Sequence, residues 1–244
     1  MNIKLFCVRI IYFIKGYFQN KHSSQEVHNK DWEKINTLSQ QDFNSAFLLS
    51  KEEDTAMWFK ENVNHATLIA NLENFFGHKL NNFTLVDIGS GAGRFVSYNL
   101  KIFKKIISVE PSLQGYSFQK KAFALNSNVF LYNLYAEDFF QQINLQDKNL
   151  LIYTNAVLHH IKDNAVKKIL DKINNLPNKT YLLFNESYTS NNSRQKYWLG
   201  HVRPKKFYID FLNNYDLNFF EHYDNSINKE INWNIRGGFI AKKN

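Results

Sequence analysis

Short apolar runs alternate with helix-spaced segments along most of this chain. Runs of strand length predict five strands, at residues 83–88, 105–110, 128–133, 150–154 and 180–185. Between some of these runs, apolar positions at helical spacing predict helices over about 93–103, 113–125 and 163–174. Strands that alternate with helices indicate crossover connections, so the pattern predicts an α/β domain with a mostly parallel sheet.

The two ends of the chain follow other patterns. Residues 50–77 have helical apolar spacing that stops at a glycine, and we expect residues 1–79 to form a helical N-terminal extension of a domain over 80–244. After residue 205 a short helical segment precedes two predicted strands, near 217–223 and 233–242. The chain therefore reads as one domain with an added amino-terminal part.

A glycine-rich turn follows the first predicted strand, at Gly89, Gly91 and Gly93. Glycines let a backbone approach a ligand closely, and the helix that follows presents free N–H groups. A dinucleotide site requires the spacing G-x-G-x-x-G, whereas Arg94 stands here in place of the third glycine. No Gly-Lys-Ser/Thr follows either, so the spacing argues against NAD, FAD and phosphate-loop sites.

Asp87 precedes the turn and completes the pattern D-x-G-x-G-x-G. This pattern resembles motif I of the class I S-adenosylmethionine (SAM)-dependent methyltransferases, and the resemblance extends over roughly residues 80–244. It implies a seven-stranded sheet, mostly parallel, with helices on both faces and an antiparallel last strand around Gly237 and Gly238. It also implies SAM as the cofactor and methyl transfer as the activity.

The resemblance implies a set of cofactor-binding residues at the ends of successive strands. In the first loop these are Asp87, Gly89, Ser90, Gly91 and Gly93. Glu110 lies 17 residues beyond Gly93 at the end of the second strand, where a carboxylate can accept hydrogen bonds from both ribose hydroxyls. After the third strand, Glu137 or Asp138 would contact the adenine amino group, or would instead complement a helix dipole. Asn155 ends the fourth strand.

Candidate catalytic residues are histidines. The segment Leu158-His159-His160-Ile161 is similar to one that follows the fourth strand in many small-molecule methyltransferases. A histidine there, or His201, could act as general base for a hydroxyl acceptor, or could be hydrogen-bonded for structure alone.

Candidate acceptor-binding residues follow the fifth strand. Aromatic rings could stack on a sugar or a base, and cations could hold an anionic group. The substrate-binding candidates are Glu186, Tyr188, Tyr197, Trp198 and Arg203.

Several chemistries are disfavoured by what the sequence lacks. Cys7 is the single cysteine, which excludes an intrachain disulfide and a cysteine-based metal cluster and argues against thiol-dependent pyrimidine methylation. The three prolines are unpaired, so the Asn/Asp-Pro-Pro motif of exocyclic-amine methylation is missing. No clustered carboxylates follow the fourth strand, and we expect no metal.

The net charge of +8 favours anionic partners. We expect oxygen methylation of a small molecule or of a sugar in a surface glycan, as in polysaccharide biosynthesis, by a cytoplasmic enzyme. A tRNA or rRNA methyltransferase and a SAM-binding scaffold without turnover are the alternatives, although no appended RNA-binding motif is recognisable.

The first 18 residues are apolar but contain Lys4, Arg9 and Lys15. These charges interrupt any run long enough to span a bilayer, and no signal-peptide cleavage site follows. The segment could lie on the inner surface of a membrane or pack on the domain or a partner subunit.

Overall fold

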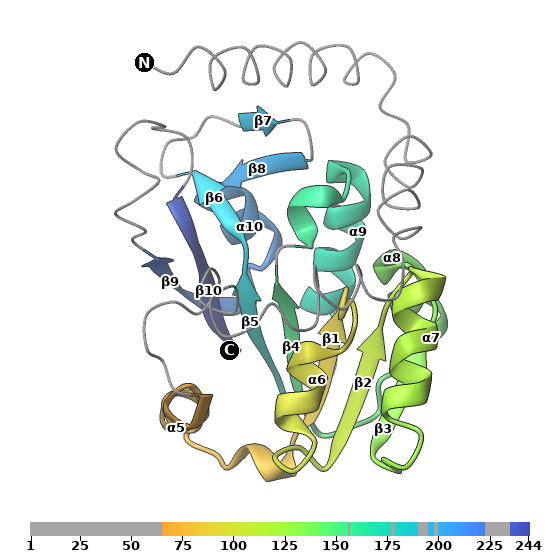
Figure 1. Ribbon diagram of the computed structural model, residues 1–244. Helices are drawn as coiled ribbons and strands as arrows, with labels where there is room; N and C mark the ends of the chain where they lie inside the picture. The colour runs from red at the N-terminus through yellow and green to blue at the C-terminus, as the bar shows by residue number, and fades with distance from the viewer. Residues whose placement is uncertain (1–64, 156, 177–178, 190–194, 198–199, 223–234) are drawn as a thin grey trace, which may run out of the picture.

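The computed structural model describes residues 65–155, 157–176, 179–189, 195–197, 200–222 and 235–244 (Figure 1). Residues 1–18, with their predicted membrane contact, lie outside these ranges, and that contact stays a prediction. None of the helices in the described part of the chain has the length and apolar character needed to span a bilayer.

Seven strands form the main sheet, in the order β3-β2-β1-β4-β5-β10-β9 (Figure 1). They are β1 (Thr84–Ile88), β2 (Lys105–Val109), β3 (Val129–Tyr132), β4 (Asn149–Asn155), β5 (Lys179–Asn185), β9 (Tyr215–His222) and β10 (Ile235–Lys243). The first five are parallel, and β10 runs antiparallel to both β5 and β9. This arrangement confirms the predicted mostly parallel sheet with an antiparallel last strand.

Three short strands extend the sheet beyond the predicted seven. They are β6 (Ser187–Thr189), β7 (Gln195–Tyr197) and β8 (Gly200–Pro204). Strand β6 pairs with the start of β10, β8 pairs with β6, and β7 pairs with β8. Strands β6, β7 and β8 therefore lie above the ends of the parallel strands (Figure 1).

Helices cover both faces of the sheet. Along the chain they are α5 (His65–Phe76), η2 (Leu80–Asn82), α6 (Arg94–Asn99), α7 (Leu113–Ala122), α8 (Ala136–Gln142), η3 (Leu158–His160), α9 (Asp163–Asn174) and α10 (Lys205–Phe211). Helix α6 ends earlier than predicted, and α8 was not among the predicted helices. With seven residues, α8 is too short for a helical period to stand out.

Two hydrophobic cores lie on opposite faces because neighbouring residues of a strand point in opposite directions. On β1, Val86 and Ile88 pack with α8, α9 and α10, whereas Leu85 packs with α5 and α6. Helix α5 precedes the predicted boundary at residue 80 yet buries Leu72 and Phe76 in the second core. All five residues of β1 are buried, as expected for a central strand covered on both faces.

Candidate active site

A tight loop of three glycines joins β1 to α6. Gly89, Gly91 and Gly93 have φ angles of 67°, 60° and 80°, a region that side chains disfavour. A Cβ atom on Gly89 would lie 2.5 Å from Cγ2 of Val157, and one on Gly93 would lie 2.6 Å from the Phe123 ring. A Cβ on Gly91 would meet nothing within 4 Å. The loop is therefore packed on two sides and open at Gly91.

Glu110 holds this loop from the end of β2. One oxygen of its carboxylate accepts from the Gly91 backbone N–H at 2.7 Å, and the other accepts from the Ser112 N–H at 2.8 Å. Ser112 in turn caps α7 through its hydroxyl, which accepts from the Gly115 N–H. The start of α7 is so close that a Cβ on Gly115 would lie 2.7 Å from the Gly91 carbonyl oxygen.

A second set of polar contacts fixes the other side of the loop. The Gln119 side-chain amide donates to Ser90 Oγ and to the Gly91 carbonyl, each at 2.8 Å. The Ser108 hydroxyl donates to Gln119 Oε1 at 2.6 Å, and its oxygen also lies 2.6 Å from Ser90 Oγ. Sequence reasoning missed Gln119. Gln119 could have been recognised as a polar residue on the buried side of the amphipathic helix α7.

Asp87 and Glu110 form a buried acidic pair beneath the loop. Asp87 is 2% exposed, and among the described residues its Oδ2 has no hydrogen-bond partner. Burial and the charge of Glu110 raise the pKa of Asp87 to about 8. Burial raises the pKa of Glu110 to about 7, although the N–H groups of Ser112 and Gly91 lower it. Two such carboxyls favour a cationic ligand, which would stabilise their ionised forms.

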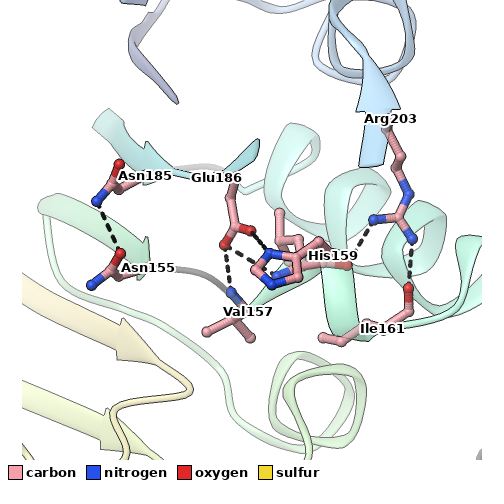
Figure 2. Close-up of polar contacts among 8 residues, drawn as sticks. Asn155, Val157, His159, Ile161, Asn185, Glu186 and Arg203 are labelled. Carbon is pink, nitrogen blue, oxygen red and sulfur yellow. Dashed lines mark hydrogen bonds and ion pairs between the residues drawn. The ribbon is translucent and has the colours of Figure 1, made fainter. Parts of the chain in front are cut away.

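The segment after β4 is held by Glu186, which follows β5 directly. One oxygen of this carboxylate accepts from the backbone N–H groups of Val157 at 2.9 Å and Leu158 at 3.1 Å (Figure 2). The other oxygen lies 3.2 Å from Nδ1 of His159. Burial raises the pKa of Glu186, but His159 and the two N–H groups outweigh burial and lower it overall. The Glu186 carboxylate is thus ionised, and both of its oxygens have partners within the protein.

Arg203, on β8, holds the same segment from another side. Its guanidinium donates to the carbonyl oxygens of Leu158 at 2.7 Å and Ile161 at 2.5 Å (Figure 2). Its Nε donates to Asp163 Oδ1 at 2.9 Å. The residue is completely buried. Arg203 therefore binds the protein's own backbone.

Comparisons with known proteins identify solved structures that have a similar fold. No protein-family model matches the chain, and no curated protein matches it. A SAM-dependent methyltransferase of Leishmania major superposes with a TM-score of 0.58 at 15% identity, covering 88% of this chain and 82% of that one. The magnesium protoporphyrin IX methyltransferase of Synechocystis, solved with bound SAM, gives 0.58 at 10% identity, covering 91% and 99%. A SAM-dependent methyltransferase of Clostridium acetobutylicum gives 0.55 at 12% identity, covering 75% and 94%.

The chain has the class I methyltransferase fold. In open α/β sheets of this kind, ligands bind beyond the carboxyl ends of the parallel strands. The glycine loop, Glu110 and the segment after β4 all lie at these ends, so the methyltransferase fold brings together residues that follow three strands, β1, β2 and β4.

The other predicted cofactor residues follow the ends of β3 and β4. Glu137 and Asp138 lie half-buried in the first turn of α8, after β3. Asn155 is the last residue of β4 and accepts a hydrogen bond of 2.9 Å from Asn185, its register partner on β5 (Figure 2).

The structure places three of the predicted substrate-binding residues in contacts within the protein. Arg203 was expected to hold an anionic group, but its guanidinium is buried against two carbonyls and Asp163. Tyr188 was expected to stack on an acceptor, but it is fully buried and packs edge-on against Phe219. Glu186 binds the backbone and His159 instead of facing open space.

The predicted catalytic histidines differ in their surroundings. His159 is 6% exposed and bonded to Glu186, and the half-buried His160 ring lies beside it at 3.9 Å between centroids. The backbones of His201 and Tyr197 lie in β8 and β7, but their side chains are outside the described part, as is all of Trp198. Among the described residues, no group of three or more His, Cys, Asp or Glu side chains could hold a metal.

Proposed function

We propose that this chain binds SAM and transfers its methyl group to a small-molecule acceptor. The observation that carries the proposal is the loop at Gly91, open on one side and lying above the buried carboxyls of Asp87 and Glu110. An open glycine lets a ligand approach the backbone, and the acidic pair suits the net positive charge of SAM. The methyltransferase fold of the neighbours supports the same cofactor.

Glu110 has acceptor capacity left for the ribose. A carboxylate offers about four lone-pair sites, and the N–H groups of Gly91 and Ser112 take one site on each oxygen. One further site per oxygen remains for the two ribose hydroxyls. Glu137 or Asp138 would bind the adenine amino group, and Asn155 would border the methionine portion.

Bound SAM would supply a methyl group already activated by its sulfonium. The chain then has to align the acceptor with that methyl group and exclude water, which can account for most of the rate. The rigid loop, held by Glu110 and Gln119, provides the alignment on the cofactor side.

A hydroxyl acceptor, in a small molecule or a glycan sugar, is the acceptor we favour, because His159 is arranged to take a proton. The ionised Glu186 would accept the proton of Nδ1, and Nε2 would then be the ring nitrogen that takes the proton of the acceptor hydroxyl. His160 and His201 remain further candidates for this role. Among the structural neighbours, one is a phosphoethanolamine N-methyltransferase of Haemonchus contortus, so acceptors vary within this fold.

Titration calorimetry with SAM tests the proposal. Gly91→Ala and Gly77→Ala form a matched pair, since both glycines have positive φ, 60° and 68°, and neither Cβ would meet a neighbour within 4 Å. Both variants bear the same backbone strain. Only Gly91→Ala should weaken SAM binding, by at least about tenfold, or about 1.4 kcal/mol. Wild-type protein that ignores SAM, or prefers NAD, would overturn the proposal.

A further inference from the structure

Arg203 and Glu186 hold one short segment, Val157 to Ile161, by different groups. Glu186 accepts from the N–H groups at its start, and Arg203 donates to carbonyl groups within it and at its end (Figure 2). We propose that Arg203 is a positioning residue that fixes the orientation of His159 toward the acceptor. The inference rests on the proposed methyltransferase function, because it assigns His159 its task.

The contact at Leu158 is the direct one. Its carbonyl, which Arg203 binds at 2.7 Å, belongs to the peptide bond that leads into His159. Its N–H donates to Glu186 at 3.1 Å. Both peptide groups that flank Leu158 are thus held by side chains, and the His159 ring is held at Nδ1. With these points fixed, the direction of Nε2 is fixed as well.

An arginine is needed for this geometry. Its planar guanidinium donates in several directions at once, and here it reaches two carbonyls and one carboxylate. A lysine could carry the charge, but its single ammonium could not span the three acceptors. An apolar side chain would fill the same volume without desolvating a charge. A wholly buried arginine at this place therefore favours one conformation of the segment more than it favours stability.

Glu186 directly precedes β6, which pairs with β8, the strand that contains Arg203. Arg203 is the register partner of Tyr188, which stands two residues after Glu186, and β6 pairs in turn with β10. The short strands β6 and β8 are thus connected, through Glu186 and Arg203, to the segment from Val157 to Ile161. A shift of these strands would be transmitted to His159 through both contacts.

Nuclear magnetic resonance of ¹⁵N-histidine-labelled full-length protein tests the inference. The His159 signals are identified by their loss in His159→Gln. In the wild type we expect one tautomer, protonated at Nδ1 and unprotonated at Nε2. In Arg203→Lys both nitrogen shifts should move toward the average of two tautomers, while SAM affinity by calorimetry stays within about threefold.

A second variant guards against unfolding of Arg203→Lys. Asp163→Ala removes one contact of the guanidinium, and the Asp163 side chain is 26% exposed, so the core stays filled. It should move the His159 shifts in the same direction by a smaller amount, and Asp171→Ala, an exposed acid on the same helix, should not. Unchanged His159 shifts in Asp163→Ala and in folded Arg203→Lys would overturn the positioning role. Failure of the wild type to bind SAM would instead reject the proposed function, independently of these spectra.

Discussion

Gly91 and Glu110 are joined by a hydrogen bond of 2.7 Å from the glycine N–H to the carboxylate. The same carboxylate accepts from Ser112 at the start of α7. One side chain thus ties the glycine loop after β1 to the helix after β2.

Glu110→Ala should weaken SAM binding strongly. The substitution leaves two backbone donors without their acceptor and removes the two proposed ribose hydrogen bonds. We expect a loss of at least about 100-fold in affinity, because hydrogen bonds to charged groups contribute about 1.5–3 kcal/mol each. Titration calorimetry measures the change. Glu73→Ala is the control, since Glu73 also accepts a backbone N–H, that of Leu80, but on the α5 side of the domain. Equal affinity in both variants would remove Glu110 from the site.

Gly115→Ala should disturb the loop from α7. Within a helix alanine is favoured over glycine by about 1 kcal/mol, so propensity alone predicts a more stable protein. Here the new Cβ would lie 2.7 Å from the Gly91 carbonyl oxygen and 3.0 Å from the Glu110 side chain. We expect a net destabilisation of about 1–3 kcal/mol in urea unfolding and weaker SAM binding. Ser117→Ala, at an exposed position of the same helix, should do neither, and a stabilised Gly115→Ala would show that the contact relaxes.

SAM binding should strengthen as the pH rises from about 6 to 8. In the free protein the pKa values are about 8 for Asp87 and about 7 for Glu110, so both groups are partly protonated at neutral pH. A cationic ligand favours their ionised forms, and binding should therefore release protons until the pH exceeds the pKa of the free Asp87. Calorimetry in buffers of different ionisation enthalpy measures this release. Asp87→Asn should reduce it, and an unchanged release would exclude Asp87 as its source.

Glu186→Gln should lower stability at neutral pH and flatten its acid dependence. The pKa of Glu186 is below its ordinary value in the folded protein, so its contribution is present above the unfolded pKa of about 4.5 and is lost as the pH falls through the folded value. We expect the variant to be less stable than the wild type by about 1–3 kcal/mol at pH 7, and we expect this difference to shrink as the pH falls below about 4.5. Urea unfolding across this pH range measures both effects. Parallel curves for the two proteins would contradict the assignment.

The features that could be predicted from the sequence are local. The apolar runs marked the five parallel strands. In a central strand such as β1, burial on both faces requires consecutive apolar residues. The glycine spacing marked the loop, because only glycine accepts three positive φ angles so close together. The position of Glu110 followed from one strand–helix–strand unit. Each of these inferences uses residues within about one such unit of the chain.

The partners of the site residues depended on the tertiary structure. Gln119 reaches Gly91 from 28 residues away, Glu186 reaches His159 from 27, and Arg203 reaches Leu158 from 45. Arg203 and Tyr188 follow the fifth strand in the sequence, and that position is compatible with acceptor binding. Only the packing of the folded chain shows that both side chains are buried. The chain by itself determined the sheet, the glycine loop and the carboxylate that serves it, since periodicity and backbone conformation are local properties. The folded structure alone decided which polar side chains meet the backbone and which stay open to a ligand, since burial depends on contacts between distant segments.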